Sequence, residues 1–399
     1  MHRFILIGLL GGFFAAAGAA QDRPVVTEAE FLSVLNERHP AVRESAGAVA
    51  LAEARLVAAR TFDNPVVEAV REDPAGPIGQ TDVLVSWKMP DAARAPEIEA
   101  REGEIGAARR RLAYDLLGYR LAMREAYAGW AVADARRQRL TLQAERVGSL
   151  AQREAVRAER GEASGLEARR LGLAAGTLRS RVALAAGASE RARAEAAAWH
   201  PGLPGDARPV LPELPDAPSL DGADVRVRAA EADLAAAELA QLATRPIVAS
   251  PEVTVGWRRQ DLTPGAVDGP IFGVAWSVPL FDRRQAARQN AGAALAAAGA
   301  RLELAERESA AARTAASANF ARLANALAEA REEVGATERM LDGEEAAFRQ
   351  GEAGLTDLLE THRSVTEAEL AVLDLHEAAL AAHRELERLA ASREGGPGS

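Results

Sequence analysis

A short glycine motif occurs twice in this sequence and divides it into two similar halves. Residues 161–163 and residues 351–353 both read Gly-Glu-Ala, and each triplet interrupts a long stretch with a helical pattern. The offset between them is 351 − 161 = 190 residues, about half of the 399-residue chain. Glycine tolerates the positive φ angle that ends one helix and turns the chain toward the next. We therefore predict two copies of one unit, each folded back at a Gly-Glu-Ala tip.

Proline is absent from the two stretches that contain these tips. None occurs between Pro96 and Pro201, or between Phe281 and Pro397. Alanine, the best helix former, is frequent in both stretches. A helix over residues 92–160 would be roughly 100 Å long at 1.5 Å per residue. Such a helix needs a partner along its length, which the stretch after each tip supplies.

The second half carries a seven-residue apolar repeat on both sides of its tip. A strict repeat of this length imposes a left-handed supercoil. We therefore predict that the two helices wind antiparallel around each other. The repeat positions before the tip are Phe320, Leu327, Val334, Leu341, Phe348 and Leu355, and those after it are Leu358, Val365, Val372, Ala379 and Leu386.

Each half also contains a stretch with the alternating pattern of a β-hairpin. These stretches follow shorter predicted helices, at residues 27–60 and 221–243. Each predicted strand is close to the 9–11 residues that a tilted strand needs to cross a bilayer. The strands are predicted at 66–70 and 81–89 around a turn at 73–79, and at 250–261 and 271–278 around a loop at 262–270.

The N-terminus has the pattern of a secretory signal peptide. A basic start at residues 1–3 precedes an apolar run at 4–14 and small residues at 15–20, so we expect cleavage after Ala19 or Ala20. The alternative is an uncleaved anchor, but it needs about 20 apolar residues and this run is shorter. No later stretch of about 18 uncharged apolar residues exists, so we expect no transmembrane helix. The predicted division of the chain is a signal peptide (1–20), a first repeat (21–200), a Pro-rich linker (201–220), a second repeat (221–391) and a disordered tail (392–399).

Composition excludes several classes of function. The formal net charge of −10 disfavours nucleic acid as a partner, because nucleic-acid-binding proteins concentrate Lys and Arg on one face. The chain has no cysteine, which excludes disulfides, thiolate metal sites, a cysteine nucleophile and a lipidated N-terminal cysteine. No catalytic triad, phosphate loop or paired-carboxylate motif is present. We therefore expect no enzyme activity and no cofactor.

Two motifs make the chain resemble a known family. Residues 278–282 read Val-Pro-Leu-Phe-Asp, and residues 348–363 contain the tip sequence Gly-Leu-Thr-Asp-Leu-Leu. Together with the repeated order of helix, β-hairpin and helical hairpin, they resemble the TolC-like outer-membrane efflux channels. The first repeat departs from the pattern, since residues 88–91 read Lys-Met-Pro-Asp and Gly165-Leu166-Glu167 replaces Gly-Leu-Thr. The resemblance covers essentially the whole mature chain.

The resemblance implies a mainly α fold with a small β part. It implies a homotrimer in which each chain gives four strands to one 12-stranded outer-membrane β-barrel, continued by an α-helical coiled-coil tunnel in the periplasm. The physics of the bilayer agrees, because an open four-stranded patch would leave unpaired backbone in lipid. Two chains would give eight strands and a filled interior, whereas three give a lumen.

The tips and three tryptophans are the candidate functional residues. The resemblance implies that the tips dock a periplasmic adaptor protein; the alternative is that they only reverse the chain. An exposed leucine at such a turn favours docking, and we expect Leu355 to be this apolar contact, where an aspartate would spare assembly. The tryptophans of the predicted strands, Trp87, Trp257 and Trp276, are expected at the membrane interface, with ordinary strand packing as the alternative. The candidate tip residues are Gly161, Glu162, Ser164, Gly165, Leu166, Gly351, Glu352, Gly354, Leu355 and Thr356.

Three histidines share one heptad stripe, which suggests a metal site. His362, His376 and His383 lie at the same heptad position as Leu355 and Glu369. Residues seven apart are about 10 Å apart along a helix, whereas ligands of one ion lie within about 2 Å of it. We therefore expect no metal site within one chain, and instead a solvated stripe beside the helix seam; the alternative is a ring of these histidines across three chains.

Two functions remain at this point. The first is a passive outer-membrane exit duct of a multipart efflux or type I secretion-like system, fed by a periplasmic adaptor and an inner-membrane transporter. The second is a soluble periplasmic coiled-coil adaptor or scaffold. The two hairpins favour the duct, because an adaptor is expected to carry soluble β domains instead. Metal ions, drugs and a polypeptide all remain open as cargo.

Overall fold

The computed structural model describes residues 24–73, 79–90, 93–222, 224–245, 250–262 and 264–390. The predicted signal peptide and the predicted C-terminal tail lie outside these residues. The elements are β1 (Val25–Val26), α1 (Glu28–Leu32), α2 (Pro40–Arg60), β2 (Val66–Glu72), β3 (Gly79–Lys88), α3 (Arg94–Glu159), α4 (Gly165–Trp199), β4 (Arg208–Pro209), α5 (Val225–Ala243), β5 (Pro251–Leu262), β6 (Gly265–Trp276), α6 (Gln285–Gln350) and α7 (Leu355–Leu389).

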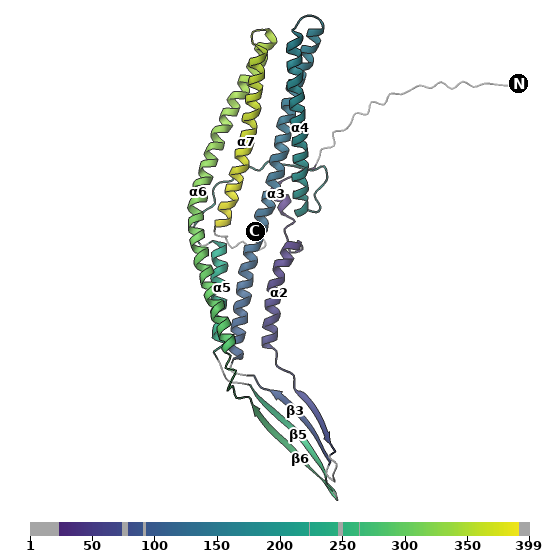
Figure 1. Ribbon diagram of the computed structural model, residues 1–399, viewed down its shortest axis with the longest axis vertical. Helices are drawn as coiled ribbons and strands as arrows, with labels where there is room; N and C mark the ends of the chain where they lie inside the picture. Colours follow the sequence, from purple (N-terminus) through teal and green to yellow (C-terminus); the bar gives the residue numbers. More distant parts are fainter. Residues whose placement is uncertain are drawn as a thin grey trace, which may run out of the picture.

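The molecule is elongated, with two helical hairpins at one end and a four-stranded sheet at the other (Figure 1). The two halves have matching elements: α3 and α6 each contain 66 residues, and α4 and α7 each contain 35. The offset between α3 and α6 is 285 − 94 = 191 residues, and that between α4 and α7 is 355 − 165 = 190. The predicted internal repeat and both long helices are therefore confirmed.

Both tips are closed by the same backbone turn. Gly161 has φ 76° and Gly351 has φ 81°, the left-handed region that glycine adopts without steric cost. A 6→1 hydrogen bond of the Schellman type closes each turn, from Glu162 N to Arg157 O and from Glu352 N to Ala347 O, both at 2.9 Å. The chain thus reverses at the two places where the sequence predicts it.

The two hairpins pack together near the tips. One apolar cluster draws residues from α3, α4, α6 and α7, so the long helices share a core there. The predicted seam between α6 and α7 is confirmed, with most repeat positions buried and Val334, Phe348 and Val372 half-buried. The shared cluster consists of Val147, Leu150, Leu171, Ala175, Leu341, Leu355, Leu358 and Val365.

At mid-length, the N-terminal segment packs onto α3 around a buried tyrosine. The Tyr127 hydroxyl lies 2.8 Å from Val26 O and 2.9 Å from Val210 O, and it accepts a hydrogen bond from Val210 N at 3.0 Å. Burial raises the pKa of Tyr127 to about 12, so the hydroxyl keeps its proton at any physiological pH. This side chain joins the start of the first repeat to the linker, where β1 and β4 form a short parallel pair that the sequence did not predict.

The prediction of one helix over residues 27–60 is wrong. The chain instead forms α1 and α2, separated at residues 33–39. Pro40 occupies the first turn of α2, where its missing amide hydrogen costs nothing. The Nδ1 atom of His39 accepts from Ala41 N at 3.3 Å and caps the new helix. A capping box of Thr27 and Glu30 starts α1.

The sheet is antiparallel, in the order β2-β3-β5-β6. The two hairpins are joined through β3 and β5, and β2 and β6 are left at the edges. The predicted loop over 262–270 is wrong, because β6 begins at Gly265 and ends at Trp276 rather than at 278. Pro270 fits within β6 because this is an edge strand, where a residue without an amide hydrogen is tolerated.

Among the described residues, no helix combines the length and the apolar character that crossing a membrane requires.

Candidate functional site

The four-stranded sheet has one apolar face and one polar face. Side chains directly opposite each other in the register share a face. On one face, the central row consists of Val67, Val85, Val255 and Phe272, all exposed. The neighbouring rows add Val83, Trp87, Val253, Trp257, Pro270, Val274 and Trp276. This face is one continuous apolar surface with no protein layer over it among the described residues.

The opposite face of the sheet is held by polar cross-strand pairs. The Asp82 carboxylate accepts two hydrogen bonds from the Arg258 guanidinium, at 2.7 and 2.8 Å. The hydroxyls of Ser86 and Thr254 are 3.1 Å apart, and a further pair, Gln80 with Gln260, is bonded at 3.3 Å. Alternation in the sequence indicated a polar face, but it could not pair Asp82 with Arg258, because that needs the register between the two hairpins.

Gly256 lies on this polar face where two strands approach closely. A Cβ atom built there would lie 2.4 Å from Val83 O and 2.6 Å from Leu84 Cδ2. No side chain fits without moving the backbone of β3, so glycine is required at this point of the β3–β5 pair.

The three predicted interface tryptophans are all exposed on the apolar face. Trp87 lies at the end of the sheet nearest the helices, where its Nε1 atom donates to Asp63 O at 3.0 Å. Trp276 lies one row further toward the helices, opposite Pro251, and Trp257 lies toward the far end. This arrangement places an amphipathic ring at each end of the apolar surface; a membrane-interface role for the three remains a prediction.

The two tips differ in the exposure of one side chain, the leucine that each tip carries. Gly161, Glu162, Ser164, Gly165 and Leu166 are all exposed, as are Gly351, Glu352, Gly354 and Thr356 in the second tip.

The expectation of an exposed Leu355 is wrong. Leu355 is only 5% exposed and belongs to the core shared by the two hairpins, whereas Leu166 is 60% exposed. The reason is the helix start: α7 begins at Leu355, and its first turn faces the seam. Leu166 is therefore the apolar side chain that the tips present to solvent.

The expectation of a solvated histidine stripe is also wrong. His362, His376 and His383 are all buried. The Pro-rich linker lies against α7, so that His376 Nε2 is 2.8 Å from Pro212 O and His383 Nε2 is 3.0 Å from Asp216 O. Within the described parts of the chain, no three His, Cys, Asp or Glu residues are grouped to hold a metal ion.

The contacts of His376 fix its protonation state. Its Nε2 atom faces a carbonyl oxygen and must donate, while its Nδ1 atom lies 2.9 Å from Arg331 Nη2 and must accept. The ring is therefore neutral. Burial lowers the pKa of His376, the positive charge of Arg331 lowers it further, and the Pro212 carbonyl opposes both effects.

This histidine should make the fold sensitive to acid. Because the folded-state pKa lies below the unfolded value of about 6.5, its contribution to stability is complete above that pH. The contribution is lost as the pH falls through about 6.5 toward the lowered pKa. We expect His376→Gln, which keeps a donor and an acceptor but does not titrate, to flatten the fall in the thermal unfolding midpoint between pH 7 and pH 5. Equal pH profiles of the variant and the wild type would contradict this assignment.

A buried polar network also joins the two hairpins, and the sequence did not reveal it. Gln143 Nε2 in α3 donates to Glu369 Oε2 in α7 at 3.1 Å, and Arg139 lies 3.4 Å from the same carboxylate. Burial raises the pKa of Glu369, against the opposing effects of Gln143 and Arg139. Glu369 lies on the histidine stripe, so heptad counting finds its position but not its partners on α3.

Comparison with known proteins identifies the fold. No family model matches the sequence, and no curated protein matches it significantly. Among solved structures, CusC is similar at 15% identity and a TM-score of 0.72, over 91% of this chain and 92% of that chain. The outer membrane protein VceC from Vibrio cholerae is similar at 15% identity and a TM-score of 0.71, over 91% and 95% of the chains.

The CmeC outer membrane channel of Campylobacter jejuni is also similar, at 9% identity and a TM-score of 0.71, over 91% of this chain and 85% of that chain. Each comparison extends over both repeats. The resemblance to the TolC-like outer-membrane channels is confirmed at the level of the fold.

Proposed function

We propose, from its TolC-like channel fold, that this protein is an outer-membrane exit duct of a multipart efflux or secretion system. The observation that carries the proposal is the two-faced sheet. Its apolar face suits acyl chains, and its polar face suits a water-filled lumen, as in outer-membrane barrels. The helices then extend into the periplasm as a conduit.

Closure of the barrel requires more than one copy of the chain. Within the described part of a single chain, β2 and β6 are edge strands whose outer backbone groups have no partner strand. Unpaired backbone groups are not tolerated in lipid, so β6 of one copy must pair with β2 of the next. Two copies would give eight strands and a filled interior, whereas three copies give 3 × 4 = 12 strands and a lumen. Three is therefore the smallest number of copies that leaves an open channel.

The sheet also argues against the second candidate function, a soluble periplasmic adaptor or scaffold. An adaptor would leave this apolar surface in water, and a contiguous exposed patch of this kind marks an interaction or membrane surface. Outer-membrane fractionation separates the two candidates. The duct requires the mature chain in the outer membrane, and a mature chain found in the soluble periplasm would favour the adaptor.

The exposed tips are proposed to dock a periplasmic adaptor protein, through which the duct serves an inner-membrane transporter. Leu166 offers an apolar contact at the end of the first hairpin, and exposed Gly-Glu pairs accompany it at both tips. We expect Leu166→Asp to assemble and insert normally but to lose transport, because an unpaired carboxylate in an apolar contact costs on the order of several kcal/mol. The assay is export by cells that carry the variant.

The matched control is Leu184→Asp, which places the same charge on the same helix, also at an exposed leucine but remote from the tip. Transport should survive this change. Wild-type transport by Leu166→Asp would show that the first tip does not form the docking contact.

A further inference from the structure

The segment that follows β6 exposes three large apolar side chains. Val278 and Leu280 are exposed, and Phe281 is 90% exposed, the highest exposed fraction among the large apolar side chains described. Water-exposed aromatic side chains of this size are uncommon unless a surface contacts a partner or a membrane.

A built turn holds Phe281 in this position. The Phe281 carbonyl accepts from Gln285 Nε2 at 3.0 Å, and Gln285 Oε1 accepts from Arg283 N at 2.7 Å. Asp282 Oδ1 accepts from Arg284 N at 2.9 Å. Among the described residues, Arg284 is the one non-glycine residue with a positive φ, 60°. Backbone strain of this kind persists where the surrounding contacts determine it, and it concentrates at functional segments.

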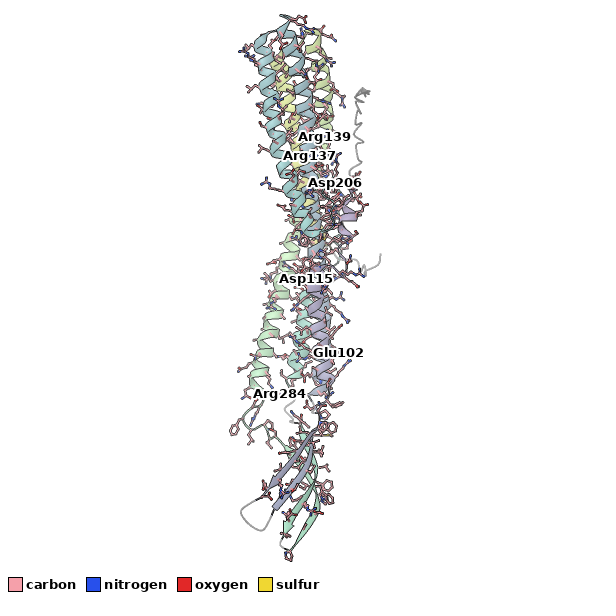
Figure 2. The ribbon with its side chains drawn as sticks, turned by 90° about the vertical axis from the view of Figure 1, so that its right-hand side faces the viewer. Glu102, Asp115, Arg137, Arg139, Asp206 and Arg284 are labelled. Atoms are coloured by element: carbon pink, nitrogen blue, oxygen red, sulfur yellow. The ribbon has the colours of Figure 1, made fainter. Side chains whose placement is uncertain are left out.

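The turn lies at the junction between the helices and the sheet, where Arg284 is labelled in Figure 2. Trp276, at the end of β6, belongs to the apolar face of the sheet, and residues 278–281 follow it in the connection to the helices. In the first repeat, the connection between α2 and β2 exposes Phe62, whose ring lies 6.4 Å from that of Trp87 and 3.9 Å from the Arg94 guanidinium. Both segments therefore combine exposed aromatic rings with arginine.

This combination matches the chemistry of a phospholipid headgroup region. Aromatic rings concentrate at the boundary between acyl chains and water, and guanidinium groups bind phosphate. Arg283 is exposed two residues after Phe281, and two residues span at most about 7 Å. A ring in the acyl boundary and a cation at the phosphate level can therefore be supplied by one short segment.

We propose that Val278–Arg283 is a membrane foot that binds phospholipid in the periplasmic leaflet of the outer membrane. Leu280 and Phe281 enter the acyl boundary, and Arg283 contacts a phosphate. The inference rests on the proposed function, because it assumes that the apolar face of the sheet lies in lipid. The foot would fix how deeply the barrel sits, since it extends the lipid-contacting surface below the last row of the strands.

The absence of cysteine allows a direct test with single-cysteine variants of the full chain. Phe281→Cys, Val274→Cys on the apolar sheet face and Leu184→Cys on α4 are each labelled with an environment-sensitive fluorophore. The labelled proteins are reconstituted into phosphatidylcholine vesicles that carry nitroxides either at the headgroup or on the acyl chain. We expect acyl-chain nitroxides to quench the label at 274, headgroup nitroxides to quench the label at 281, and neither to quench the label at 184.

The outcomes separate this inference from the proposed function. Quenching at 274 without quenching at 281 overturns the foot and leaves the duct intact, whereas absence of quenching at both positions overturns the duct as well. If Phe281→Cys prevents assembly, or if its label is shielded from both nitroxides, the segment is a contact between copies of the chain. Leu280→Cys repeats the test with the phenylalanine in place, and its label should be quenched like that at 281.

Discussion

Val255→Arg should abolish insertion of this protein into the outer membrane. Val255 lies in the central row of the apolar face, between Val85 and Phe272. An arginine on the lipid face of a barrel near the midplane costs about 2–4 kcal/mol, and every copy in the proposed ring would carry the change. The measurement is the fraction of protein that folds into lipid vesicles from denaturant, supported by outer-membrane fractionation.

Thr254→Arg is the matched control because Thr254 directly precedes Val255 in the same strand and faces the opposite side of the sheet. It places the same side chain on the polar face, at the loss of one hydroxyl contact with Ser86. Insertion should therefore be largely retained. Equal insertion of the two variants would show that the apolar face does not meet lipid.

Leu341→Asp should destroy the helical half of the molecule. Leu341 is fully buried in the cluster that α3, α4, α6 and α7 share. Loss of leucine packing alone costs about 2–5 kcal/mol, and burial of an unpaired carboxylate adds a further penalty of roughly several kcal/mol. The expected result is a very low yield of assembled protein, measured by size-exclusion chromatography of detergent extracts.

Leu355→Asp should likewise give a very low yield of assembled protein, because Leu355 belongs to the same cluster as Leu341. Sequence reasoning instead expected Leu355 to be an exposed docking contact, for which the aspartate would spare assembly. Leu184, at 76% exposed, provides the tolerant control for both variants. Normal assembly of Leu355→Asp would contradict the observed packing of the second tip.

The features that the sequence predicted depend on local patterns. The absence of proline and the glycines at 161 and 351 define the long helices and their reversals, because proline and glycine act on their own backbone. The heptad repeat places Leu327, Leu341 and Leu358 in the seam for a similar reason, since periodicity alone selects one face of each helix. The hairpins followed from alternation, with errors of several residues at the 262–270 loop.

The features that it missed depend on contacts between distant segments. His376 belongs to a heptad stripe beside the seam, and only the path of the Pro-rich linker across α7 buries it. The exposure of Leu355 depended on which way the first turn of α7 faces, which the packing of α3 and α4 against α7 decides. The pairing of Asp82 with Arg258, which are 176 residues apart in the sequence, required the register between the two hairpins.

If one chain supplies a third of a closed barrel, as we propose, the detergent-solubilised particle contains three chains. Light scattering with a correction for bound detergent, or native mass spectrometry, gives this number. We expect three copies of the mature chain in a single stable species. A stable monomer at micromolar concentration would contradict it, because the edges of β2 and β6 would then remain unpaired.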